Sequence, residues 1–137
     1  MLLPLLFALT ALPVAPELRM TFTNLNTAKG QLYVAVYDNA GSFLKPEKVV
    51  WKAIVPVSQA GSLELSASGL RPGVYAVSCF HDLNNNGKLD TNLFGVPTEP
   101  YGFSNNVRPT FRAPNWEEAR FELRPEGSAI SIRLEKW

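Results

Sequence analysis

The chain has 137 residues, 46% of them hydrophobic, and its 13 Lys and Arg nearly balance its 12 Asp and Glu. This length fits one domain, and the apolar content suffices for a buried core, which excludes a chain that is disordered by composition. The balanced charge gives no sign of the basic face that binding to nucleic acid requires.

The first fifteen residues, MLLPLLFALTALPVA, form an apolar segment with no charged side chain. The segment is shorter than the ~20 residues of a membrane-spanning helix and suits the core of a signal peptide. The basic residues that usually precede such a core are missing, and Pro16 would hinder cleavage directly after Ala15. We expect residues 1–15 to be a signal peptide and residues 16–137 to be one periplasmic or secreted domain that is not transmembrane once processed. The alternative is a buried N-terminal segment of a cytosolic domain.

From residue 18 onward the apolar residues recur with a period of two, which is typical of β-strands. The segment 74–80 is a nearly continuous apolar run, as expected of a central strand that is covered on both faces. Helical turns are expected only near 41–45 and 115–118. The pattern predicts an all-β fold, a single antiparallel β-sandwich of about seven strands. The segments that fit are 18–23, 32–37, 49–57, 63–66, 74–80, 119–124 and 130–135.

The central run contains Cys79, the single cysteine, which cannot form an internal disulfide. We expect it to be a small buried hydrophobe. The run is entered through Leu70-x-Pro72-Gly73-x-Tyr75, where Pro presets φ and Gly accepts a positive φ in a turn. This entry resembles the prealbumin-like and carboxypeptidase-regulatory-like sandwiches. The resemblance implies a transthyretin-like fold and says nothing about activity.

Residues 81–106, HDLNNNGKLDTNLFGVPTEPYGFSNN, have almost no β periodicity and contain six Asn. An irregular segment of this length in a compact domain is usually functional or disordered. Apolar residues distributed along it favour an ordered, functional loop. The expected anchors are Leu89, Leu93, Phe94, Val96, Tyr101 and Phe103.

The first half of this loop has the spacing of a calcium loop. Such loops place oxygen ligands at alternate positions 1, 3 and 5, turn sharply at a Gly in position 6, and offer a carbonyl at position 7. Alternate side chains of a tight coil converge on one point, which suits an ion that takes six to eight hard oxygens. The expected ligands are Asp82, Asn84, Asn86, the carbonyl of Lys88, and Asp90 at position 9.

The twelfth position departs from the EF-hand, because Leu93 stands where a bidentate Glu is needed. Only Asp82 and Asp90 carry formal charge, so we expect a modest affinity unless Glu99 or Asp38 also reaches the ion. Two interpretations stay open: a calcium site, or a metal-free loop that satisfies its own backbone through Asx turns.

His81 is the only histidine, and three roles are open for it. It holds the loop backbone at a strand end, or contacts a ligand, or acts in a hydrolase with Glu99 or Asp90 as partner and Ser104 or Tyr101 nearby. One histidine is too few for a usual zinc site, and no Gly-x-Ser-x-Gly elbow is present, so we expect no enzyme.

The second half of the loop, residues 95–106, combines two Pro and two Gly with polar tips, which favours a preformed surface. Tyr101 and Phe103 are either anchors on the fold or an aromatic platform for a sugar or peptide. Glu99 is either a remote metal ligand or a partner for Arg108 or Arg112. Ser104 and Asn105 complete the expected loop site with His81 and the two aromatic residues.

These motifs together resemble a bacterial family, the domain of unknown function 2141. The family has a His-Asp-x-Asn-x-Asn-Gly-Lys-Leu-Asp-Thr-Asn block, then Gly-x-Pro-x-Glu, then Gly-Phe-Ser-Asn, present here as His81–Asn92, Gly95–Glu99 and Gly102–Asn105. The likeness extends upstream to Tyr37–Phe43 and downstream to Pro114–Leu123. One departure is Asn85, where the family usually has Gly. The resemblance implies an exported bacterial protein, a β-sandwich, and no established activity.

From these observations we expect an exported binding module that is stabilised by calcium and recognises a ligand or protein partner that the sequence does not identify. The alternative is a metal-free structural or assembly protein of the cell envelope. A hydrolase that uses His81 and Glu99 is the least favoured interpretation.

Overall fold

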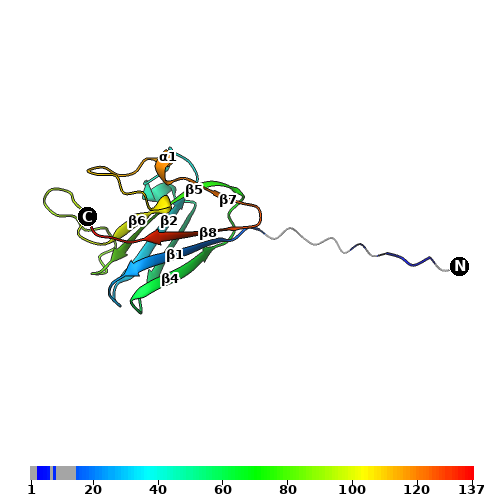
Figure 1. The fold of residues 1–137 in the computed structure, drawn as a ribbon, viewed down its shortest axis with the longest axis horizontal. Helices are drawn as coiled ribbons and strands as arrows, with labels where there is room; N and C mark the ends of the chain where they lie inside the picture. The colour runs from blue at the N-terminus through cyan, green and yellow to red at the C-terminus, as the bar shows by residue number, and fades with distance from the viewer. Residues whose placement is uncertain (1–2, 7, 9–14) are drawn as a thin grey trace.

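The computed structural model describes residues 3–6, 8 and 15–137, and most of the signal peptide expected over residues 1–15 lies outside them. The regular elements of the described chain are mainly strands, so the expected all-β class is confirmed (Figure 1). None of its helices is long and apolar enough to cross a membrane. The elements are β1 (Leu18–Leu25), β2 (Gln31–Tyr37), η1 (Pro46–Lys48), β3 (Trp51–Pro56), β4 (Gly61–Ala67), β5 (Gly73–Asp82), β6 (Tyr101–Phe103), η2 (Ser104–Asn106), α1 (Trp116–Ala119), β7 (Phe121–Leu123) and β8 (Ser128–Arg133).

The strands form two sheets. One has the order β4-β1-β8, and the other has the order β3-β2-β5-β6, with β7 paired to the start of β5. The pair β1–β8 is parallel, so the expectation of a purely antiparallel arrangement is wrong at this pair. The physical reason is that β7 lies in the other sheet, so the chain crosses between sheets before β8 instead of turning back in a hairpin.

Each of the seven expected segments overlaps a strand, but among the described residues there are eight strands. The additional strand is β6, which lies inside the loop that was expected to be irregular. It pairs with β5 over only three residues, from Ser78↔Phe103 to Phe80↔Tyr101. A strand of this length carries too few residues to show a period of two.

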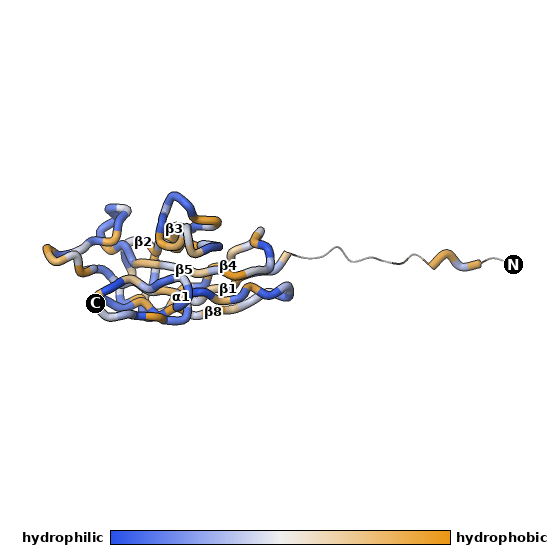
Figure 2. Tube along the Cα trace, turned by 90° about the horizontal axis from the view of Figure 1, so that it is seen from above, coloured by the Kyte–Doolittle hydropathy of each residue, from blue (hydrophilic) through white to orange (hydrophobic). Residues whose placement is uncertain are grey.

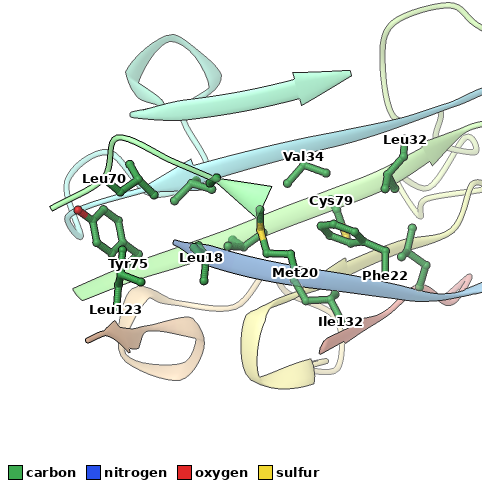
Figure 3. Close-up of a cluster of buried hydrophobic side chains, with 14 of the residues drawn as sticks. Leu18, Met20, Phe22, Leu32, Val34, Leu70, Tyr75, Cys79, Leu123 and Ile132 are labelled. Carbon is green, nitrogen blue, oxygen red and sulfur yellow. The ribbon is translucent and has the colours of Figure 1, made fainter. Parts of the chain in front are cut away.

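The core lies between the two sheets. Met20 and Phe22 of β1 face Val34 of β2 and Cys79 of β5, and all four side chains are at most 4% exposed (Figure 3). Alternate residues on a strand point to the same face, so the period of two in the sequence identified these positions. The expectation that Cys79 is a buried hydrophobe is confirmed, and burial raises the pKa of its thiol, which keeps it in the unreactive form.

The turn that leads into β5 is held by Tyr75, whose hydroxyl donates a hydrogen bond of 2.6 Å to the carbonyl of Arg71. Leu70 and Tyr75 are each 7% exposed and belong to the core. The expectation that Gly73 takes a positive φ is wrong, because it pairs with Leu123 of β7 and is therefore the first extended residue of β5. The positive φ of this turn is at Gly69, at +82°.

Candidate functional site

The loop after β5 starts from a tightly held strand end. Asp82 lies opposite Gln31 of β2, and the turn before β2 passes so close that a Cβ on Gly30 would lie 2.0 Å from the Asp82 carbonyl oxygen. His81 is 1% exposed, and its Nε2 donates to the carbonyl of Lys29 at 2.6 Å. The strand end, and with it the first expected ligand, is therefore fixed against the β1–β2 turn.

Asp82 is fully buried and organises the coil that follows it. Its Oδ2 accepts a hydrogen bond from the Gly87 amide at 2.8 Å, and its Oδ1 accepts from the Asn86 amide at 3.3 Å. Gly87 has φ +79° and Asn85 has φ +57°. This left-handed conformation accounts for a Gly preference at position 85, and Asn is among the few other residues that adopt it readily.

Three exposed or half-exposed side chains of this coil meet at one point. The amide nitrogen of Asn84 lies 2.6 Å from Oδ2 of Asp90, and that of Asn86 lies 2.5 Å from Oδ1. These two amide donors lower the pKa of the Asp90 carboxyl. The oxygens of the same amides accept from the backbone of Asn86 and Lys88, which makes two Asx turns. Expected positions 3, 5 and 9 are thus brought together.

Glu99 is buried, and from the second half of the loop it holds the coil through hydrogen bonds. Its Oε2 accepts from the Leu83 amide at 2.6 Å, and its Oε1 accepts from the Asp90 amide at 2.9 Å. Of the two alternatives for Glu99, the pairing with Arg108 or Arg112 is wrong, because both of its oxygens accept from the loop backbone. These arginines pair instead with other carboxylates of the described chain, Arg108 with Glu135 and Arg112 with Glu118.

Asp38 was considered as an additional ligand, and the structure excludes this. It follows Tyr37, which pairs with Ala76, whereas the loop begins beside Gln31 at the opposite end of β2. The length of β2, roughly 20 Å at about 3.3 Å per residue, separates Asp38 from the coil.

Within the described residues, no group of three or more His, Cys, Asp or Glu side chains is placed to hold a metal ion. An ion in this loop would therefore depend on amide and carbonyl oxygens in addition to Asp82 and Asp90. In the same part of the chain, every buried side-chain nitrogen or oxygen has a hydrogen-bond partner. The loop is consequently able to satisfy its own polar groups.

Residues 91–97 form a small hairpin that projects from the loop, closed by the bridge between Thr91 and Pro97. The Asn92 side chain accepts from the amides of Phe94 and Val96 and shapes its tip. The tip is apolar (Figure 2), with Leu93 101% and Phe94 90% exposed. The expectation that these two residues anchor the loop is wrong, because a turn this tight directs them outward. The expected core anchor Leu89 is only half-buried and lies outside the core cluster.

Ser104 and Asn105 connect the second half of the loop to three distant elements. Ser104 is fully buried, and its hydroxyl accepts from the Val77 amide of β5 at 2.9 Å and donates to the Ala119 carbonyl of α1. Asn105, at φ +62°, donates to the carbonyls of Glu118 and Arg120. These residues join β5, α1 and the approach to β7, and they do not face the coil that holds Asp90.

Tyr101 and Phe103 are half-buried on the side of the five-stranded sheet that faces away from the core. Their rings contact each other with centroids 5.8 Å apart, and the guanidinium of Arg108 lies 4.3 Å from the centre of the Tyr101 ring. They therefore pack on the sheet as anchors and remain partly exposed.

The segment from Asp82 through Glu99 to Ser104 lies within the part of the chain that matches a family model. The model described as "Uncharacterized protein conserved in bacteria (DUF2141)" matches residues 20–131. The chain belongs to this family. A search of curated proteins and a search of solved structures each found no match.

One surface of this DUF2141 chain was missed by the sequence reasoning. Beside Tyr101 and Phe103, residues of β2, β3 and β5 surround a hollow of about 590 Å³. The available signal was the second set of alternate positions in the segment 32–37, where Tyr33, Ala35 and Tyr37 occupy what would ordinarily be a polar face. Their low polarity indicates a sheet face that is not simply solvated.

Proposed function

We propose that this protein is an exported binding module whose loop, residues 81–106, is stabilised by calcium. The observation that carries the proposal is the meeting of Asn84, Asn86 and Asp90, with both amides within 2.6 Å of the carboxylate. It occurs on a coil that is already turned by Asp82 and Gly87, at the spacing of a calcium loop.

The donor set of the coil fits a hard cation. A half-turn of the terminal amides of Asn84 and Asn86 exchanges nitrogen for oxygen. It breaks their two Asx turns, and both would then offer oxygen beside the Asp90 carboxylate. Asp82 and the Lys88 carbonyl would complete the set. Calcium prefers oxygen ligands of this kind and tolerates irregular geometry, whereas magnesium requires a near-ideal octahedron.

The ion would fix the coil in one conformation relative to β5. Two carboxylates are few for a calcium site, so we expect a dissociation constant of about 10⁻⁴–10⁻³ M, the range of extracellular modules. At about 10 mM calcium this affinity corresponds to a stabilisation of about 1.4–2.7 kcal/mol.

The test is thermal melting of the purified protein in about 10 mM calcium, in the same concentration of magnesium, and in chelator. We expect calcium to raise Tm by roughly 4–10 °C over chelator and magnesium to raise it less. Equal melting temperatures in calcium and chelator would contradict the proposal.

Variants of the loop test whether the calcium-dependent rise in Tm comes from this site. Asn86→Ala and Asp90→Asn should each abolish the calcium-dependent rise in Tm, because each removes an oxygen ligand or its charge. Asn26→Ala is the matched control, since Asn26 is an exposed asparagine outside the loop. If the loop variants keep the full calcium response, the ion binds elsewhere and the assignment fails.

The alternative is a metal-free structural or assembly protein of the cell envelope. It is supported by the complete pairing of buried polar side chains in the described residues and by the two backbone amides that Glu99 accepts from. These contacts hold the loop without an ion. The melting experiment separates the two functions, because this alternative predicts no response to calcium.

Two further parts of the proposal concern architecture and location. The two packed sheets and the Leu70-x-Pro72-Gly73-x-Tyr75 entry support a prealbumin-like β-sandwich. The uncharged apolar segment 1–15 supports export to the periplasm or beyond. Mass spectrometry of the protein from fractionated cells tests export, and an uncleaved chain confined to the cytoplasm would contradict it.

A further inference from the structure

The five-stranded sheet has an outer face, the face directed away from the core, on which the register aligns two rows of side chains across four strands. One row lies next to the loop, and the second row lies one step further along the strands. The first row is Ile54, Tyr33, Phe80 and Tyr101, and the second is Lys52, Ala35, Ser78 and Phe103.

The second row creates the hollow because its two central side chains are small. Ala35 and Ser78 are directly paired, and they form a floor beside the larger Tyr33 and Phe80. The rings of Tyr33 and Phe80 are stacked, with centroids 4.8 Å apart and an interplanar angle of 13°, so they form one continuous wall. Large and small side chains side by side on a sheet leave a depression.

Two connections raise the rim of this depression. Leu44 and Pro46 close it at the end remote from the loop, and Lys88 and Leu89 of the loop close it at the other end. The volume of this open hollow, about 590 Å³, is within the roughly 300–1,000 Å³ of small-molecule sites. Its lining is mainly apolar, with the Ser78 hydroxyl as a polar group on the floor.

The charges on the lining are of one sign. Among the described residues that line the hollow, the charged side chains are Lys52 and Lys88, and no carboxylate is present. Neither lysine takes part in an ion pair of the described chain. Lys88 is near enough to Asp90 to lower the pKa of that carboxyl, behind the larger effect of the Asn donors. Lys52, at the open edge formed by β3, is therefore the cation available to a ligand.

One carboxylate outside the rim, that of Glu47, lies near the hollow and limits this charge. Glu47 is close enough to Tyr37 to raise the pKa of its hydroxyl, although burial is the larger cause. It belongs to η1 and does not line the hollow. The charged side chains that line the hollow itself are consequently both cationic.

We propose that the outer-face hollow binds an amphipathic monocarboxylate. The apolar body of the ligand lies over Ala35 and Ser78 against the wall of Tyr33 and Phe80, and its carboxylate pairs with Lys52. Burial of the apolar body provides affinity, and the lysine selects the charge. This inference goes beyond the proposed function and needs no metal in the loop.

The experiment uses three probes with the same eight-carbon chain: octanoate, octan-1-ol and octylamine. Each is titrated into the isotopically labelled protein in chelator and followed by amide chemical shifts. We expect saturable shifts at Ala35 and Ser78 and an affinity for octanoate at least about tenfold above the affinities for the alcohol and the amine, which corresponds to about 1.4 kcal/mol.

Two variants and a control assign the contacts. Lys52→Met should reduce the affinity for octanoate to that for octan-1-ol, whereas Lys48→Met should leave it unchanged, because Lys48 is exposed nearby but does not line the hollow. Ala35→Leu should fill the floor and abolish binding of all three probes. Ser78→Val is the second filling variant if Ala35→Leu does not fold.

Several outcomes would overturn the proposal. The first is that octylamine or octan-1-ol binds as tightly as octanoate. The second is that the chemical shifts do not saturate. The third is that Ala35→Leu or Ser78→Val folds and still binds octanoate with unchanged affinity. A second copy of the chain seated on this face would give a concentration-dependent dimer in sedimentation and no octanoate binding, which also overturns it. Because the titration is performed in chelator, a failure of the calcium proposal leaves this result interpretable.

Discussion

Asn84 and Asn86, in the first half of the loop, donate to a carboxylate at most 6 positions away along the chain. Ser104 and Asn105, in the second half, bond to backbone groups between 13 and 27 positions away. The two halves use similar polar residues, but the first stabilises its own conformation and the second connects separate elements.

The difference teaches which part of the loop can change without loss of the fold. If Asn84 and Asn86 exchange their hydrogen-bond partners for an ion, only the exposed coil is affected. The first half of the loop is therefore suited to bind and release an ion. Ser104 occupies the gap along β5 between β7, whose first residue lies opposite Tyr75, and β6, whose last residue lies opposite Ser78. Its hydroxyl replaces a missing strand partner there, and the sheet depends on it.

The largest effect is expected for Ser104→Ala. The substitution leaves the buried amide of Val77 without its hydrogen-bond acceptor and removes the bond to the Ala119 carbonyl. We expect a loss of about 2–4 kcal/mol in the free energy of unfolding, measured by urea denaturation. Ser66→Ala, at an exposed position of β4, is the control. A loss below about 0.5 kcal/mol for Ser104→Ala would remove the distinction between the two halves.

Intermediate effects are expected at Asn105, which has φ +62° and donates two hydrogen bonds. Asn105→Gly keeps the backbone conformation and should cost about 1 kcal/mol through the lost bonds. Asn105→Val adds the strain of a β-branched residue in the left-handed region and should cost about 1–2 kcal/mol more. Asn85→Gly is the matched substitution in the first half, and denaturation should show a change within about 0.5 kcal/mol.

The smallest effect concerns the titration of Asp90. Its pKa is lowered in the folded protein, so its contribution to stability is fully present above its unfolded pKa and is lost as the pH falls through the folded pKa. Carboxyl ¹³C signals should show a pKa below the ordinary 3.8, and the double variant Asn84→Ala/Asn86→Ala should raise it toward that value. Glu118, whose pKa is lowered to about 2 by Arg112, should titrate unchanged in the variant. An unshifted Asp90 would show that the amides do not converge on it in solution.

Much of the fold could be predicted because strand periodicity reports burial directly. The alternation of Leu18, Met20 and Phe22 is the alternation of core and outer positions in β1. The strand β6 could not be predicted, since its three residues are too few to show a period of two and its partner is the distant strand β5. A Cβ on its central residue, Gly102, would lie 2.7 Å from the Arg133 carbonyl oxygen, and this close approach has no signal in one sequence.

The candidate site also has features that could be predicted from the sequence and features that could not. The sharp turn of the coil at Gly87, five positions after Asp82, was predictable because the loop motif places its Gly there. The role of Glu99 could not be predicted, because this role depends on a reversal of the chain that brings Glu99 to Leu83, 16 positions earlier. The outward position of Leu93 and Phe94 also depends on this reversal, and hydrophobicity alone pointed the other way.

The amino-acid sequence by itself determined seven of the eight strands of the described residues, the buried Cys79, the coil that starts at Asp82 and the family. These features depend on contacts between near neighbours or on a regular period. The tertiary structure alone decided the parallel pair β1–β8, the bonds of Ser104 and Glu99, and the hollow over Ala35 and Ser78. Each of these depends on which segments lie side by side, and register between distant strands is set by the packing of the whole core.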